Sequence, residues 1–221
     1  MKMTKRISSG IAGLDAITCG GFPEKSMILV SGHCGAGKTI LGLQFICNSD
    51  DRGIFVSFEE GLDKIRDTAR QFGWEIEKME REGKIRLLKY DPYRFEDIFD
   101  IIENNIREID ARRIVIDSIS ALGVYVHDVP ELRRIVLQAG LLMKKYSCTA
   151  LLLSEIARHG EVSRFGVEEF VCDGVVILEN TMRNEEYRRT MHIMKMRFTD
   201  HSKKAHVYEI GRNGINVKWT E

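Results

Sequence analysis

Near the start of the chain, a glycine-rich octapeptide joins two segments with different hydrophobic patterns. Ser26–Ser31 is a short apolar run that predicts a buried strand, and Thr39–Cys47 has the pattern of a helix. Between them, Gly32-His-Cys-Gly-Ala-Gly-Lys-Thr39 fits the pattern G-x-x-x-x-G-K-[ST]. The order strand, loop, helix is the context that a phosphate-binding loop requires, and a chance match in a glycine-rich turn would lack it.

The composition of this loop predicts how it would bind a nucleotide. Its glycines let backbone N–H groups turn inward around phosphate oxygens, and the following helix presents the positive end of its dipole. In such a loop the ammonium group of Lys38 reaches the β- and γ-phosphates, and the hydroxyl of Thr39 is a ligand of Mg2+. The predicted nucleotide-binding residues are Gly32, His33, Cys34, Gly35, Ala36, Gly37, Lys38, Thr39 and Ile40.

Strands and helices alternate through the middle of the chain. Apolar runs predict strands, and helical spacing of apolar residues predicts helices. The strands are Gly53–Phe58, Lys84–Tyr90, Arg113–Ile116 and Cys148–Leu153, and the helices are Leu62–Phe72, Phe95–Ile109 and Pro130–Tyr146. This alternation predicts an α/β fold with a mainly parallel sheet that helices cover on both faces.

After Phe170 the pattern contains only strands. They are expected at Val171–Leu178, Tyr187–Met196 and Ala205–Val217, and the last includes Arg212-Asn-Gly214, a hairpin turn signal. The α/β core is therefore expected to end in an antiparallel β extension. No repeat or linker interrupts the pattern, so residues 1–221 are expected to form a single domain.

The composition narrows the partners and the compartment. The 33 basic residues balance the 33 acidic residues, which argues against bulk attraction to nucleic acid or to anionic lipid. The five cysteines form no CxxC pair, which favours free thiols in a reducing compartment. No secretion signal is visible at the start, and no apolar run approaches the roughly 20 residues that span a bilayer. We expect a cytoplasmic protein.

Three carboxylates follow predicted strands. Asp117 ends the strand Arg113–Ile116, where a carboxylate beside the phosphate loop can hold the water shell of Mg2+. Glu59 and Glu60 end the second strand, where one carboxylate could accept a proton from the water that attacks the γ-phosphate. The neighbouring loop favours the metal role over an ordinary strand-ending aspartate for Asp117. For the two glutamates, chemistry alone leaves a base and a solvated pair equally open.

Lys195 and Arg197 are two cations on one predicted strand of the extension. Their alternation points them to the same face. The pattern alone favours a solvated pair that protects an edge strand from aggregation. The six histidines show no spacing typical of metal ligands.

A series of segments resembles the RecA-like ATPases of the KaiC group. The similarity runs in order from about residue 6 to about residue 217, and it is closest to the first, ATP-hydrolysing domain of the family's circadian-clock member. The chain resembles one such domain rather than the tandem pair. The matching segments are Ile7–Asp15, Gly20–Pro23, Leu29–Gly32, Phe55–Glu60, Ala69–Trp74, Ile116–Ser118, Arg164–Phe170, Arg188–Thr190 and Lys195–His201.

The resemblance implies roles for residues outside the phosphate loop. Glu59 matches the family's catalytic glutamate, and Glu60 matches its neighbour. Lys195 and Arg197 match residues that reach across a ring interface to the nucleotide of the adjacent subunit. Other positions that match residues near a nucleotide are Met196, Thr199 and His201, then Gln71 near the adenine, and Gly211 and Arg212 at the base and ribose from the adjacent subunit.

The sequence departs from the clock protein at three places. Gly211-Arg212 replaces Thr-Asp, and Gln71 replaces a serine. Glu169-Phe170 stands where the clock protein's second domain has the Ser-Thr pair that it phosphorylates. The resemblance therefore implies an ATPase without autokinase activity.

The leading hypothesis is an ATPase that binds ATP and Mg2+ between the subunits of a homo-oligomeric ring, expected to be a hexamer, in a regulatory or signalling role. One alternative is a recombinase-type module that binds single-stranded DNA and hydrolyses little ATP. The zero net charge and the lack of a basic loop interleaved with aromatic residues count against it. Another alternative is a regulatory protein in which ATP binding changes the partners and turnover is incidental.

Overall fold

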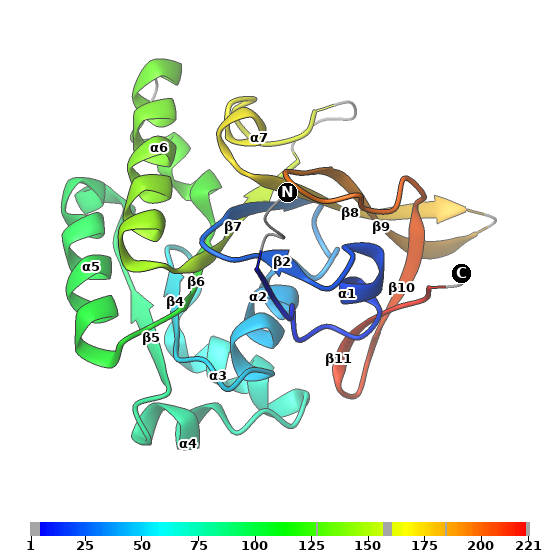
Figure 1. Cartoon of the computed structure of the whole chain (residues 1–221), viewed down its shortest axis with the longest axis horizontal. Helices are drawn as coiled ribbons and strands as arrows, with labels where there is room; N and C mark the ends of the chain where they lie inside the picture. The colour runs from blue at the N-terminus through cyan, green and yellow to red at the C-terminus, as the bar shows by residue number, and fades with distance from the viewer. Residues whose placement is uncertain (1–4, 127, 157–160, 184, 220–221) are drawn as a thin grey trace.

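The computed structural model describes residues 5–126, 128–156, 161–183 and 185–219. Helices and strands alternate as far as β8, and strands follow (Figure 1). The elements are β1 (Arg6–Ile7), α1 (Leu14–Ile17), β2 (Phe22–Pro23), β3 (Met27–Gly32), α2 (Lys38–Cys47), β4 (Gly53–Ser57), α3 (Leu62–Gln71), α4 (Ile76–Arg81), β5 (Ile85–Lys89), the 3-10 helix η1 (Pro92–Asp97), α5 (Ile98–Ile109), β6 (Arg113–Asp117), the 3-10 helix η2 (Ile119–Val124), α6 (Val129–Tyr146), β7 (Thr149–Glu155), α7 (Glu168–Val171), β8 (Gly174–Arg183), β9 (Glu186–Met196), β10 (His206–Gly211) and β11 (Gly214–Val217).

One sheet of nine strands organises the chain, in the order β11-β10-β9-β8-β3-β7-β6-β4-β5. The strands from β8 to β5 in this order pair in parallel. From β8 to β11 the pairs are antiparallel. The predicted α/β fold, with a mainly parallel sheet and an antiparallel extension at its end, is confirmed.

The central strand β3 shows why the sheet needs helices on both faces. All six of its residues are buried, and successive side chains point to opposite faces. Ile28 and Val30 pack in the core that α2, α3 and α4 cover, whereas Met27 and Leu29 pack in the core that α5 and α6 cover. Both faces of this strand are thus withdrawn from water, and its carboxyl end remains open for a site.

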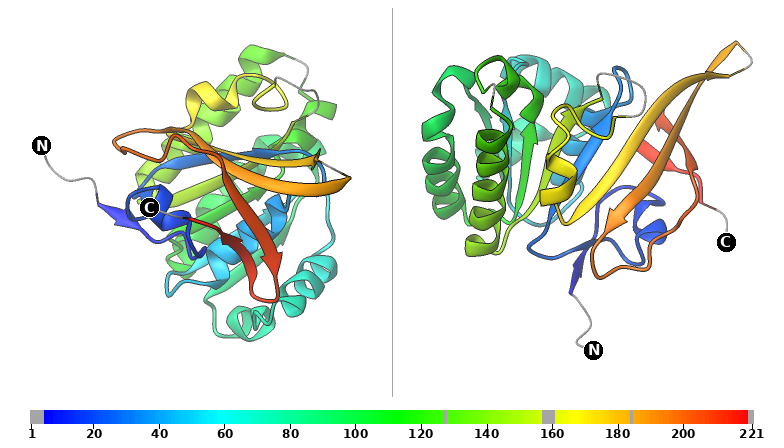
Figure 2. Two further views of the ribbon diagram at one scale, coloured as in Figure 1. Left: turned by 90° about the vertical axis from the view of Figure 1, so that its right-hand side faces the viewer. Right: turned by 90° about the horizontal axis from the view of Figure 1, so that it is seen from above.

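The β8–β9 hairpin projects beyond the rest of the molecule (Figure 2). The β10–β11 hairpin instead folds back onto α2, where the amide side chain of Gln44 holds it. The Ile215 N–H donates to Gln44 Oε1 at 2.7 Å, and Gln44 Nε2 donates to the Ile215 carbonyl at 3.1 Å. The extension is thereby attached to the helix that follows the phosphate loop.

Several predicted boundaries were wrong. The strand expected from Val171 begins at Gly174, because Glu168–Val171 form the short helix α7. The helix expected from Phe95 begins at Ile98, after the 3-10 turn η1. The segment Ala205–Val217 contains two strands, as its turn signal indicated. The sequence pattern did not predict α4, which has six residues and only one fully buried residue, too few for a periodic signal.

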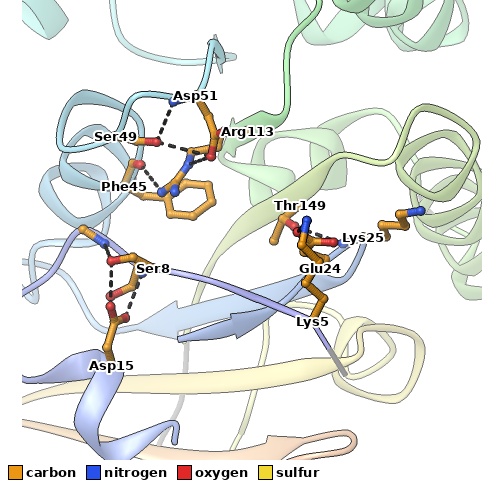
Figure 3. A network of polar contacts seen from close by, with 12 residues as sticks. Lys5, Ser8, Asp15, Glu24, Lys25, Phe45, Ser49, Asp51, Arg113 and Thr149 are labelled. Carbon is orange, nitrogen blue, oxygen red and sulfur yellow. Dashed lines mark hydrogen bonds and ion pairs between the residues drawn. The ribbon is translucent and has the colours of Figure 1, made fainter. Parts of the chain in front are cut away.

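Polar contacts close the amino-terminal end of the sheet (Figure 3). Arg113 is only 4% exposed and donates to Asp51 Oδ2 and to the Phe45 carbonyl, both at 2.9 Å. A buried guanidinium needs such partners, because desolvation without them is strongly unfavourable. In the same view, Lys5 pairs with Glu24 at 2.7 Å.

The five cysteines are free thiols; Cys47, Cys148 and Cys172 are buried, and Cys19 and Cys34 are exposed. Within the described residues, no helix has the length and apolar character needed to cross a membrane.

Candidate nucleotide site

The glycine-rich loop lies between the end of β3 at Gly32 and the start of α2 at Lys38. Gly35 and Gly37 have φ of 75° and 88°, a region that side chains with a Cβ avoid. At Gly32 a Cβ would lie 2.6 Å from the Leu178 carbonyl oxygen, so the close approach of β8 requires glycine there. Glycine is thus required at Gly35 and Gly37 by the backbone conformation and at Gly32 by the close approach of β8.

The ammonium group of Lys38 lies within the curve of this loop. Its Nζ donates to the carbonyls of Gly32 at 2.9 Å and His33 at 3.2 Å. Burial lowers its pKa, while the carboxylates of Glu155 and Asp117 oppose that shift. In phosphate-binding loops of this pattern, a lysine at this position reaches the β- and γ-phosphate oxygens.

Thr39 and Asp117 form the predicted pair beside the loop. The Thr39 hydroxyl, in the first turn of α2, donates to Asp117 Oδ2, at the end of β6, at 2.7 Å. Burial is the main reason that the pKa of Asp117 rises to about 6, and the negative charges of Glu60 and Glu59 add to it. A buried carboxylate with acidic neighbours favours a cation at this position.

The residues around this pair suit a hydrated Mg2+. The hydroxyl and carboxylate oxygens of Thr39 and Asp117 are hard ligands, and Mg2+ normally keeps several waters and uses phosphate oxygens for the rest. The adjacent Ser118 Oγ is buried and has no hydrogen-bond partner among the residues described, so it could bond such a water. The described residues contain no cluster of three or more His, Cys, Asp or Glu side chains that would form a protein-only metal site.

Glu59 and Glu60 lie in the turn that follows β4, and both are exposed. The turn is held to β6 because the Phe58 N–H donates to the Asp117 carbonyl at 2.8 Å. Within the turn, Ser57 Oγ donates to the Glu60 carbonyl at 2.8 Å. The charge of Glu59 acts on the pKa of both Lys38 and Asp117, whereas that of Glu60 acts on Asp117. Of these two glutamates, Glu59 is therefore the one whose charge acts on both the lysine and the aspartate of the site.

Glu155, which ends β7, is a site residue that was not predicted from the sequence. It lies opposite Gly32 in the parallel ladder, and its charge is the largest influence that opposes the lowered pKa of Lys38. Its backbone N–H donates to Ser120 Oγ at 2.9 Å. The rule that singled out Asp117, an acidic residue directly after an apolar strand, applies equally to Glu155 and could have found it.

Lys195 and Arg197 converge on one segment of their own chain, at the end of α7 and the start of β8. Lys195 Nζ donates to the carbonyls of Glu169 at 3.0 Å and Cys172 at 2.6 Å. Arg197 lies just beyond β9, 45% exposed, and its Nη1 pairs with Asp173 Oδ1 at 2.9 Å. The predicted common face is thus occupied by contacts within the chain, and Arg197 is the more accessible cation.

The other residues of this segment that were predicted near a nucleotide, Met196, Thr199 and His201, have contacts within the chain. Met196 and His201 are buried, and His201 Nδ1 lies 2.9 Å from the Ser202 carbonyl. The Thr199 hydroxyl accepts from Arg6 Nη2 at 2.8 Å and donates to the Arg197 carbonyl at 3.2 Å. These side chains shape the loop after β9 rather than line an open surface.

Gly211 ends β10, and the preceding residue Ile210 packs against Gly37 of the phosphate loop. Gly211 borders a cleft of about 640 Å³ between β9 and β10. The cleft residues Arg189 and Tyr208 donate to the carbonyls of Gly35 and Ala36. Arg212 is exposed in the β10–β11 turn, and Gln71 is exposed at the end of α3.

Comparisons with known proteins find relatives that match nearly the whole chain. The family model described as "ATPase: KaiC" matches residues 7–221. The chain is 35% identical to the circadian clock oscillator protein KaiC of a Picosynechococcus strain, over 98% of this chain and 45% of that protein. The corresponding protein of Synechococcus elongatus is 36% identical over 94% of this chain and 43% of that protein. The chain therefore spans less than half the length of these relatives.

A solved structure extends the comparison to the fold. The KaiC-like protein of the hyperthermophilic archaeon Pyrococcus horikoshii superposes with a TM-score of 0.90 at 36% identity, and the match covers 97% of this chain and 99% of that one. The phosphate loop, the Thr39–Asp117 pair and these matches lead to one conclusion. The chain belongs to the KaiC family of ATPases.

Proposed function

We propose that the chain hydrolyses ATP in the presence of Mg2+. The observation that carries the proposal is the 2.7 Å contact between Thr39 and Asp117 at the mouth of a complete phosphate loop. Mg2+ bound there would neutralise developing charge on the β- and γ-phosphates. Thr39 and Asp117 would hold it, directly and through water.

Glu59 is proposed as the general base, and Glu60 as the neighbour that orients it or the water. A base must be an acceptor that can reach the proton of the attacking water. The exposed carboxylate of Glu59 follows β4 and influences Lys38, the group that reaches the γ-phosphate. Lys38 would then change its partners from the carbonyls of Gly32 and His33 to phosphate oxygens.

The cleft between β9 and β10 is proposed to receive the base and ribose of ATP. Its volume of about 640 Å³ is within the range of nucleotide-sized pockets. Gly211 leaves one wall open, and Arg189 links the cleft to the phosphate loop at Gly35. Arg212 and Gln71, on neighbouring turns, are candidates for the rim.

We further propose a homo-oligomeric ring, expected to be a hexamer, in which Arg197 acts on the nucleotide of the adjacent subunit. Rotation builds every interface of a ring head-to-tail, so one surface can face a different surface of the neighbour. The half-exposed Arg197 can exchange Asp173 for a phosphate at little cost, because an exposed ion pair contributes little. Lys195 is expected to support the turn through its two carbonyl partners.

We propose that the chain is a single domain. We also propose that it acts in the cytoplasm in a regulatory role. Autophosphorylation is not expected, since Glu169 and Phe170 carry no hydroxyl acceptor.

Phosphate release from ATP tests the central proposal. We expect turnover with Mg2+ and its loss in EDTA, and we expect Asp117→Ala to require far more Mg2+ than the control Asp63→Ala, whose side chain is fully in solvent. If the wild-type protein releases no phosphate with Mg2+, or if Asp117→Ala has an unchanged Mg2+ requirement, the proposal is wrong.

A further inference from the structure

Phe198, directly after Arg197, combines two unfavourable features. Its φ is 60°, a left-handed conformation in which the Cβ of a bulky residue crowds the backbone. Its ring is 75% exposed, so burial within the chain does not offset this strain. Among the described residues, the other non-glycine residues with positive φ are polar or small: Cys19, Lys25, Asp110, Ser147 and Glu185.

The turn that carries Phe198 is held from the amino-terminal side by one guanidinium. Arg6 Nη2 donates to the Phe198 carbonyl at 3.0 Å and to Thr199 Oγ1 at 2.8 Å. Its Nη1 donates to the carbonyls of Thr18 at 3.1 Å and Gly21 at 2.9 Å. Arg6 itself lies in β1, which pairs with β2. The guanidinium therefore joins the turn to a fixed part of the fold.

The same turn is held from the other side by the start of β8. The Arg197 N–H donates to the Asp173 carbonyl at 2.9 Å, and the Arg197 side chain pairs with the Asp173 carboxylate. Asp200, two residues after Phe198, accepts at its backbone carbonyl from Cys19 Sγ at 2.7 Å, which adds a second contact from the amino-terminal segment. A strained conformation persists only where surrounding contacts determine it, and here they do so on both sides.

We propose that Phe198 is an interface residue that packs against a second copy of this chain, and that Arg6 is the positioning residue that presents it. This inference rests on the proposed ring. A second copy is the favoured partner because Phe198 directly follows Arg197, the cation proposed to reach the neighbouring subunit. The aromatic side chain therefore lies next to the surface that this neighbour would cover. Aromatic side chains are rigid, and they are enriched among the residues that dominate interface energies.

The test uses a substitution that should weaken assembly without lowering the stability of the single chain. In Phe198→Gly the residue adopts positive φ without strain, so the melting temperature of the unassembled chain should not fall. Assembly with a non-hydrolysable ATP analogue should weaken: the protein concentration for half-assembly, from sedimentation velocity, should rise at least about fivefold. Phe198→Asn, another residue that tolerates this conformation, should behave in the same way.

Two further variants separate the interface from general effects. Tyr93→Ala removes a ring that is 72% exposed on η1, and it should assemble as the wild type does. Arg6→Ala should weaken assembly, and combining it with Phe198→Gly should add little, because both act on one contact.

The inference is overturned if Phe198→Gly and Phe198→Asn assemble at wild-type concentrations. It also falls, together with the ring, if the wild-type chain does not assemble with nucleotide. Binding of a fluorescent ATP analogue and phosphate release by the same samples report on the proposed ATPase separately.

Discussion

The phosphate site and the turn around Arg197 are built by different means. At the first, Lys38 begins the helix after the β3 loop, Asp117 ends β6 and Glu59 lies in the turn after β4. The parallel ladders place the ends of these strands at one edge of the sheet. At the second, Arg197, Phe198 and Thr199 lie beyond β9, where side chains from distant parts of the chain hold them. Backbone pairing thus determines the site for the chain's own nucleotide, and side-chain contacts determine the part proposed to serve a neighbour.

The largest effect expected at the phosphate site is that of Lys38→Ala. Loss of the ammonium group leaves the triphosphate without its main cationic partner in the loop, so tight ATP binding and turnover should disappear. Titration with a fluorescent ATP analogue measures this directly. Lys78→Ala, an exposed lysine on α4, is a matched control that should bind normally. Unchanged affinity in Lys38→Ala would remove the basis for the site.

Arg197→Ala tests whether the second region acts on another subunit. Arginine residues supplied across an interface contribute about 10³–10⁵ in rate, whereas a solvated cation contributes almost nothing. The variant alone should lose turnover on that scale and still bind ATP. Arg134→Ala, an exposed arginine on α6, is the control.

Mixing then separates action between subunits from action within one. Lys38→Ala has a disabled loop with Arg197 intact, and Arg197→Ala has the reverse. Mixed assemblies should regain activity that neither variant shows alone. Normal turnover by Arg197→Ala, with assembly intact, would show that Arg197 is only a surface charge.

Glu59→Gln should keep ATP binding and slow phosphate release by about a hundredfold or more, the scale of general-base loss. Glu60→Gln removes a similar exposed charge from the adjacent position, and it should slow phosphate release less than Glu59→Gln does. Rapid-quench kinetics distinguish the two. If Glu60→Gln is the damaging variant and Glu59→Gln is silent, the two roles must be exchanged.

The smallest effect concerns stability rather than rate. The folded-state pKa of Asp117 is about 6, above its ordinary value of 3.8, so without metal the folded state binds this proton more tightly than the unfolded state. The contribution of Asp117 to stability therefore falls as pH rises from about 4 to about 6. Asp117→Asn should be more stable than the wild type at pH 7 by at most about 3 kcal/mol, and equally stable near pH 4.

Denaturant unfolding at the two pH values, without nucleotide or metal, measures this difference. Asp63→Asn, with its exposed carboxylate, should show no such dependence. A gain for Asp117→Asn that is as large at pH 4 as at pH 7 would contradict the assigned cause.

The contrast between the two regions also explains what the sequence could predict. The loop Gly32–Thr39 and Asp117 were found because each depends on neighbours within a few residues, and the hydrophobic pattern that predicts the strands also places their ends. The contacts of Arg6 could not be found in this way, since its partner Phe198 is 192 residues away. Similarly, the contact of Tyr208 with the Ala36 carbonyl depends on how β10–β11 folds back onto α2.

Glu155 is an intermediate case, because its signal was present but was not used. Boundaries failed where an irregular turn interrupts a continuous apolar pattern, as at α7 and η1. Side-chain composition does not distinguish a strand from a short helix at such places.

The position of β8 has a mechanical consequence. On one side β8 bonds to β3, which ends in the phosphate loop, and on the other to β9, which ends at Arg197. A hydrogen-bonded sheet resists stretching between adjacent strands. The end of β3 and the end of β9 therefore move together as parts of one rigid body. In the proposed ring, a subunit that tilts to close around its own ATP would displace its arginine relative to the next ATP by a related amount. The order in which the sites hydrolyse ATP would then depend on how the subunits tilt relative to one another. A conformational change within each subunit would not be needed.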